Sequence, residues 1–89
     1  MPTVRFTENL QRHVLCPTRD VPGTTVREAL DQYFATNARA RDYVLDDLGR
    51  LRKHMVAFVD GRQVTDRSGL SDAVSPLSAI DIIQSLSGG

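Results

Sequence analysis

The chain has 89 residues, of which 40% are hydrophobic and 25% are charged. This composition is typical of a globular domain and argues against a disordered chain. The length leaves room for one small domain, which we expect to span residues 1–89. Eleven Lys and Arg balance eleven Asp and Glu, so the net charge points to no nucleic-acid or membrane partner, and we expect neither.

Cysteine usage and hydropathy bear on the cellular compartment. The chain has one cysteine, so it cannot form an internal disulfide, and a reducing compartment fits. The first ten residues, MPTVRFTENL, lack the basic segment and apolar run of a secretory signal. No stretch approaches the ~20 apolar residues of a membrane span. We therefore expect a cytoplasmic location.

The N-terminal third begins with two predicted strands. In residues 3–7, Val4 and Phe6 alternate with Arg5, which is the period-two pattern of a half-buried strand. After a short turn, residues 12–17 (RHVLCP) form a second apolar run that ends at a proline. We expect these two runs to pair as a hairpin.

The clearest local signal is a helix that follows Pro22 and Gly23. Thr25 can cap its start, and Glu28, three residues later, completes a capping box. Five apolar side chains then recur at helical spacing and form one stripe: Val26, Ala29, Leu30, Tyr33 and Phe34. We expect this stripe to lie across a sheet and the helix to end near Asn37.

The remaining elements are one short helical turn and three strands. Residues 38–49 predict the turn, with Tyr43, Val44 and Leu48 inward and Gly49 as its left-handed end.

The Asp60-Gly61 pair predicts a tight hairpin, with one strand before it and a short return through Gln63 and Val64. The last strand covers residues 79–86. This order of strands and helix predicts an α+β domain of two layers, in which one main helix packs on one face of a small mixed sheet.

Alternation in the two apolar strands predicts which side chains face the helix. We expect an inward set: Ala57, Val59, Ile80 and Ile82. The outward set, called here the outer patch, comprises Val56, Phe58, Ile83 and Leu86. An exposed apolar patch marks a contact surface. The alternative is that a loop or a different register buries these side chains.

The chain continues past its last strand into Ser87, Gly88 and Gly89, which can bury almost nothing. We expect residues 86–89 to form a flexible tail that contributes little to folding. A frayed chain end or residues left by cloning can have the same sequence, so the tail alone does not establish a function.

Three candidate sites are weak. Cys16 with His13 or His54 could be a thiol nucleophile with a base, but a lone cysteine is more often a small buried hydrophobe. Asp46 and Asp47 are neighbours that do not face each other on a helical turn.

A third candidate is a cluster of basic residues, whose charge nearby acids reduce: Arg39, Arg41, Arg50, Arg52 and Lys53. No spacing of Cys and His fits a metal site. We therefore expect no catalytic residue and no metal ligand.

The order of elements, the helix signature PGTTVREAL, the strand and turn VAFVDGRQV and the closing IIQSLSGG together resemble the MoaD/ThiS family. These are ubiquitin-like β-grasp sulfur carriers, including the small subunit of molybdopterin synthase and the carriers of thiamine and cysteine biosynthesis. The resemblance covers nearly the whole chain and implies a β-grasp fold.

The resemblance also implies chemistry at Gly89. In such carriers an adenylating enzyme of the ubiquitin-activating type joins the C-terminal carboxylate to AMP from MgATP, and sulfur delivery by a sulfurtransferase then gives a thiocarboxylate. A sulfur-accepting synthase would use the product. The chain would be a substrate, with no cofactor of its own, and Ser87 and Gly88 would thread the partner's channel. Ubiquitin-like proteins meet partners through the outer sheet face, which favours docking by the outer patch.

The chain departs from the molybdopterin-type members at residues 84–86, where Gln-Ser-Leu stands in place of a Pro pair and a Val. The stretch from Tyr43 to Val64 looks more like the cysteine-biosynthesis carriers.

Two other functions stay open: a protein modifier joined through Gly89 to lysines, and a β-grasp interaction domain with an inert tail. Lys53 is the only lysine, so self-linked chains would need Lys53 or the N-terminal amine.

Overall fold

The computed structural model describes residues 1–85, and the predicted tail, 86–89, lies outside the described residues. The elements in chain order are β1 (Thr3–Phe6), α1 (Glu8–Gln11), β2 (Arg19–Asp20), α2 (Val26–Phe34), α3 (Ala38–Val44), β3 (Met55–Val59), β4 (Arg62–Gln63) and β5 (Ala79–Gln84).

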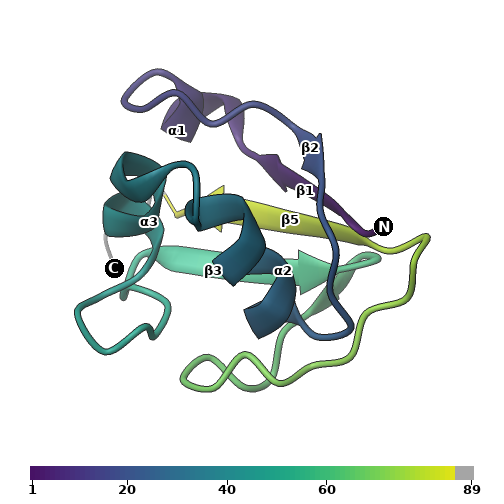
Figure 1. Ribbon diagram of the computed structural model, residues 1–89. Helices are drawn as coiled ribbons and strands as arrows, with labels where there is room; N and C mark the ends of the chain where they lie inside the picture. Colours follow the sequence, from purple (N-terminus) through teal and green to yellow (C-terminus); the bar gives the residue numbers. More distant parts are fainter. Residues whose placement is uncertain (86–89) are drawn as a thin grey trace.

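The strands form a five-stranded sheet in the order β2-β1-β5-β3-β4. β5 lies at its centre, parallel to β1 and antiparallel to β3. The main helix, α2, lies across one face of this sheet (Figure 1). The predicted α+β architecture, with one main helix on a small mixed sheet, is therefore confirmed. None of the helices in residues 1–85 is long and apolar enough to span a membrane.

The start of α2 shows how the sequence fixes the helix. The Thr25 hydroxyl oxygen accepts the Glu28 N–H at 3.1 Å, as predicted for the cap. The Glu28 carboxylate reaches back one residue farther than expected and accepts the N–H and the hydroxyl of Thr24, both at 2.8 Å. These hydrogen bonds, the backbone one foremost, lower the pKa of Glu28.

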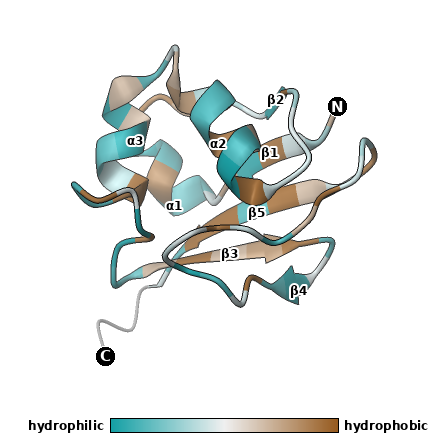
Figure 2. Ribbon diagram, turned by 60° about the horizontal axis from the view of Figure 1, so that its bottom comes forward, coloured by the Kyte–Doolittle hydropathy of each residue, from teal (hydrophilic) through white to brown (hydrophobic). Residues whose placement is uncertain are grey.

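All five residues of the predicted α2 stripe are buried. Tyr33 packs on Phe6 of β1, with ring centroids 5.0 Å apart, and its hydroxyl donates to the Pro17 carbonyl at 2.6 Å. Figure 2 shows β3 and β5 as hydrophobic ribbons next to α2. The core therefore lies between α2 and the inner sheet face.

The predicted strand at residues 12–17 is wrong. The chain forms α1 after β1, and the Val14 N–H donates to the Leu10 carbonyl. Val14 and Cys16 enter the core from an irregular segment. The antiparallel partner of β1 is β2, with Val4 opposite Arg19. The apolar side chains of this segment are buried without any strand pairing, so a short apolar run that ends at a proline was not a sufficient sign of a strand.

The predicted helical turn at residues 38–49 is partly right. Asn37 begins α3 by accepting the Ala40 N–H at 3.2 Å, rather than ending α2. Val44 is buried as expected, but Tyr43 is 38% and Leu48 74% exposed, so their inward placement is wrong.

Leu48 points outward because it lies in a separate turn, held by the Asp46 carboxylate. That carboxylate accepts the N–H groups of Leu48 and Arg50. Gly49 has the predicted positive φ of 78° but belongs to this turn and not to the end of α3.

The Asp60-Gly61 hairpin between β3 and β4 is confirmed. Both turn residues have positive φ, 51° and 84°, and Val59 pairs with Arg62 across a two-residue loop. The Asp60 carboxylate also accepts the Ala79 N–H at 2.9 Å, which is the foremost cause of its lowered pKa. The turn thus fixes the start of β5.

We predict that Gly61→Val destabilises the fold. No atom lies within 4 Å of an added Cβ, so the cost comes from the positive φ, which a β-branched residue tolerates badly, and should be about 1–3 kcal/mol. Gly61→Asn is the matched control, because Asn adopts this conformation readily. Thermal or urea unfolding checks both variants, and equal stability of Gly61→Val and wild type would contradict the assignment.

Candidate functional site

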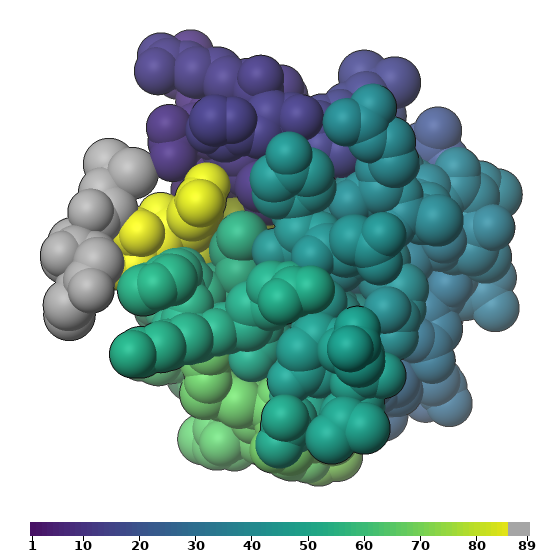
Figure 3. Space-filling model, turned by 90° about the vertical axis from the view of Figure 1, so that its left-hand side faces the viewer, coloured from purple at the N-terminus to yellow at the C-terminus, as the bar shows by residue number. Residues whose placement is uncertain are grey.

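The first feature of the candidate site is the point at which the chain leaves the sheet. The Ser85 N–H donates to the His54 carbonyl at 2.8 Å, and the Asn9 amide donates to the Gln84 side-chain oxygen at 3.3 Å. Figure 3 shows the yellow end of β5 at the surface, between the purple N-terminal segment and the teal-green segment that leads into β3.

Four predicted site residues lie outside the described residues: Leu86, Ser87, Gly88 and Gly89. Their roles therefore stay predictions.

The second feature is the sheet face opposite α2, called here the outer face. The predicted inward set is buried: Ala57, Val59, Ile80 and Ile82. The three described members of the outer patch are half-buried: Val56, Phe58 and Ile83. Val56 pairs with Ile83 and Phe58 with Asp81. The predicted alternation of both strands is confirmed, while the docking role of the patch stays a prediction.

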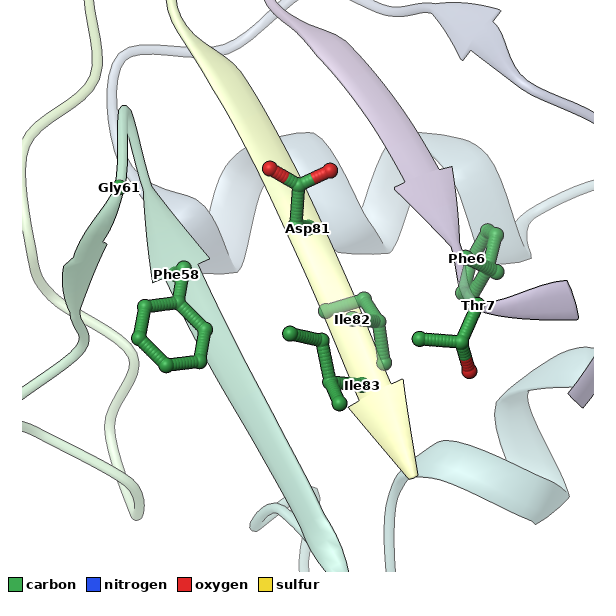
Figure 4. A pocket seen from close by; sticks show the side chains of 7 residues that line it. All are labelled: Phe6, Thr7, Phe58, Gly61, Asp81, Ile82 and Ile83. Carbon is green, nitrogen blue, oxygen red and sulfur yellow. The ribbon is translucent and has the colours of Figure 1, made fainter. Parts of the chain in front are cut away.

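A hollow of about 360 Å³ opens on the outer face. Its lining residues are Phe6, Thr7, Phe58, Gly61, Asp81, Ile82 and Ile83. Figure 4 shows the Phe58 ring and the Ile83 side chain on neighbouring strands, with the Thr7 methyl facing Ile83. The surface is mainly apolar and suits an apolar side chain of a partner.

An ion pair borders this hollow, and sequence reasoning missed it. Arg5 lies opposite Asp81 in the parallel register of β1 and β5. Its guanidinium makes two hydrogen bonds to the carboxylate, at 2.7 and 2.9 Å. These bonds and the charge of Asp81 raise the pKa of Arg5. Alternation in the sequence could have shown that Arg5 and Asp81 both point to the outer face. The sequence could not have shown that they lie opposite each other, because that depends on the register of β1 and β5.

The weak sequence candidates gain no support as reactive groups. Cys16 is 1% exposed, and burial raises the pKa of its thiol, which disfavours the reactive thiolate. The His13 ring stacks on Tyr43 with centroids 6.4 Å apart.

The Asp46 carboxylate accepts hydrogen bonds from the Leu48 N–H, the Arg50 N–H and the Arg50 guanidinium. Asp46 is engaged in its turn, and the Arg50 N–H is the foremost cause of its lowered pKa. Within residues 1–85, no group of three or more His, Cys, Asp or Glu could hold a metal ion.

Comparisons with known proteins bear on the fold. No protein-family model matches the chain, and no curated protein matches it either. Solved structures do match. A chain of the Amycolatopsis orientalis BexX/CysO complex is 21% identical with a TM-score of 0.82, and the match covers 100% of both chains.

Two further structures show the same similarity. Mycobacterium tuberculosis CysO is 18% identical with a TM-score of 0.79, over 97% of this chain and 100% of that one. Small archaeal modifier protein 1 from Methanosarcina acetivorans is 21% identical with a TM-score of 0.77, over 99% and 95%. The ubiquitin-like β-grasp fold, predicted through the resemblance to sulfur carriers, is confirmed.

We predict opposite sensitivities for two neighbouring isoleucines of β5. Ile82 is fully buried, so Ile82→Ala should cost about 2–5 kcal/mol of stability. Ile83 is half-buried on the outer face, so Ile83→Ala should cost about 1 kcal/mol or less. Urea unfolding of the two variants measures both costs. Equal losses would mean that Ile83 belongs to the core.

Proposed function

We propose that this chain is a sulfur carrier whose Gly89 carboxylate is activated with ATP and converted to a thiocarboxylate. The observation that supports this most is the placement of β5. The central strand ends at Gln84, and the chain then continues with five residues that end in Gly-Gly. The fold that it shares with the two CysO structures points the same way.

The chemistry suits the terminal group. An α-carboxyl group has a pKa of about 3.5, so it is ionised at neutral pH. The carboxylate can therefore attack the α-phosphorus of ATP. Pyrophosphate leaves and an acyl adenylate forms. Hydrosulfide then attacks the acyl carbon, displaces AMP and loses a proton, which leaves the thiocarboxylate. The persulfide sulfur of a sulfurtransferase would instead form an acyl disulfide, from which a thiol reductant releases the thiocarboxylate. Gly88 and Gly89 lack Cβ atoms, which lets the backbone enter a narrow channel.

In this proposal the protein is a substrate of other enzymes and binds no cofactor itself. MgATP belongs to an adenylating partner of the ubiquitin-activating type, and a synthase accepts the sulfur. The residues that resemble the cysteine-biosynthesis carriers, 43–64, favour that pathway. A cytoplasmic location is part of the proposal, because the adenylating partner uses MgATP and the single cysteine fits a reducing compartment.

The outer face is the proposed docking surface for the adenylating partner. Phe58 and Ile83 offer apolar area beside a hollow, and the Arg5–Asp81 pair adds a polar border. A partner that inserts an apolar side chain into this hollow would remove the exposed apolar surface from water. Such a contact would leave the end of β5 free to deliver the tail.

A second candidate function is protein modification, in which Gly89 is joined to lysines of other proteins. The fold similarity to small archaeal modifier protein 1 favours it. Adducts of higher mass in an extract of the source cells would identify the modifier, whereas a gain of sulfur identifies the carrier. An inert interaction domain would show neither.

We predict that Gly89 deletion and Gly89→Ala leave stability within about ±0.5 kcal/mol, because Gly89 has no side chain to bury and alanine adds one methyl group. Sulfur loading should nevertheless collapse, since small misplacements of a reacting group can cost ~100-fold. The three proteins are incubated with the adenylating enzyme of the same organism, MgATP and sulfide, and their intact masses are measured.

Only the wild type should gain the mass difference between sulfur and oxygen. ATP–pyrophosphate exchange, followed in parallel, reports the adenylation step by itself. If the shortened chain is adenylated and loaded as readily as the wild type, the sulfur-carrier proposal is wrong.

We predict that Phe58→Asp and Ile83→Asp weaken binding to the adenylating enzyme while the fold persists. Loss of a central apolar anchor commonly costs ~2 kcal/mol or more, which is roughly 30-fold in affinity. Leu48→Asp is the matched control, because Leu48 is an exposed apolar residue in a separate turn. Titration calorimetry and melting curves separate binding from stability, and equal effects of all three variants would exclude the outer face.

A further inference from the structure

Three side chains form a row across the outer face, and two of them are charged. Arg5 of β1 lies opposite Asp81 of β5, and Asp81 lies opposite Phe58 of β3. Asp81 also lines the apolar hollow, on the strand that carries Ile83 (Figure 4). A carboxylate therefore lies at the wall of the surface to which the proposed function assigns docking.

Arg5 satisfies both oxygens of the Asp81 carboxylate. Its Nε donates to Oδ1 at 2.7 Å and its Nη2 to Oδ2 at 2.9 Å, which is the geometry of a bidentate ion pair. The two side chains are 51% and 31% exposed. At such exposure water screens the attraction, so the pair contributes little to the stability of the free protein.

A partner that fills the hollow changes the surroundings of this pair. It removes water from the Asp81 carboxylate, and a charge without water or a counterion is costly. Arg5 offsets that cost because it stays bonded to both carboxylate oxygens. Removing Arg5 would leave the Asp81 charge uncompensated under the partner, so the penalty would appear in the complex and not in the free protein.

We propose that the Arg5–Asp81 pair determines which partner surface docks on the outer face, because it lets an uncharged, apolar surface of the adenylating enzyme cover Asp81. The two charges cancel and both carboxylate oxygens are occupied. A charged group on the partner would meet a like charge in the pair and would lose its own water without a free counterion. The choice of the adenylating enzyme as partner rests on the proposed function.

The test measures binding to the adenylating enzyme of the same organism, without ATP, by titration calorimetry. Arg5→Leu should weaken binding about 30-fold or more, because Asp81 is then covered without its counterion. Arg5→Leu combined with Asp81→Leu should recover most of this loss, since apolar side chains can replace a buried ion pair. The melting midpoints of both variants should stay within about 8 °C of the wild type.

Two further variants serve as controls. Arg5→Asp combined with Asp81→Arg reverses the pair and keeps the total charge, so it should bind within about threefold of the wild type if the partner surface is uncharged. Arg50→Leu breaks an ion pair of similar exposure, Arg50 to Asp46 at 2.9 Å, in the turn that the Asp46 carboxylate holds. That turn does not line the hollow, so Arg50→Leu should bind as the wild type does.

Intact mass after loading with MgATP and sulfide separates this inference from the proposed function. If the wild type gains sulfur but Arg5→Leu binds as tightly as the wild type, the pair has no role in docking and the sulfur-carrier proposal stands. If the reversed pair binds as weakly as Arg5→Leu, the partner recognises one of the charges itself and the inference of an uncharged surface is overturned. If the wild type does not bind the enzyme, this inference and the proposed docking are both wrong.

Discussion

The pairing of β5 with two neighbouring strands organises the whole sheet. The strand pairs with β1 on one side and β3 on the other, and its side chains alternate between the core and the outer face. A slip of one residue would bury Asp81 and expose Ile80 and Ile82. The same ladder therefore fixes the core, the hollow on the outer face and the position of Gln84, from which the chain leaves the sheet.

Local patterns explain the features that the sequence predicts well. Three features depend only on neighbours within a few residues: the alternation in β3 and β5, the Thr25 cap and the Asp60-Gly61 turn. The local sequence is therefore enough to predict them. Residues 12–17 were misassigned because their burial depends on tertiary contacts, which a short apolar run does not specify. Leu48 was misplaced because the Asp46 carboxylate organises a turn of its own.

The candidate site also has features that the local sequence predicts and features that depend on strand pairing. The outward positions of Phe58 and Ile83 follow from alternation, but the hollow between them requires the register of two strands distant in sequence. The Arg5–Asp81 pair joins residues 76 apart, and the Ser85 N–H meets the His54 carbonyl only because β3 and β5 are paired. The proposed function assigns the chemistry to Gly89, and the described strands set only the place where the chain leaves β5 after Gln84.

The sulfur-carrier function requires that the terminal carboxyl group of Gly89 carry sulfur in the cell. The most direct measurement is high-resolution mass spectrometry of the C-terminal peptide from protein isolated from its source organism, under denaturing conditions and without reductant. We predict a fraction of peptides in which sulfur replaces one carboxyl oxygen of Gly89. If every copy ends in an ordinary carboxylate, or if Gly89 is found only in conjugates with other proteins, the carrier account is contradicted.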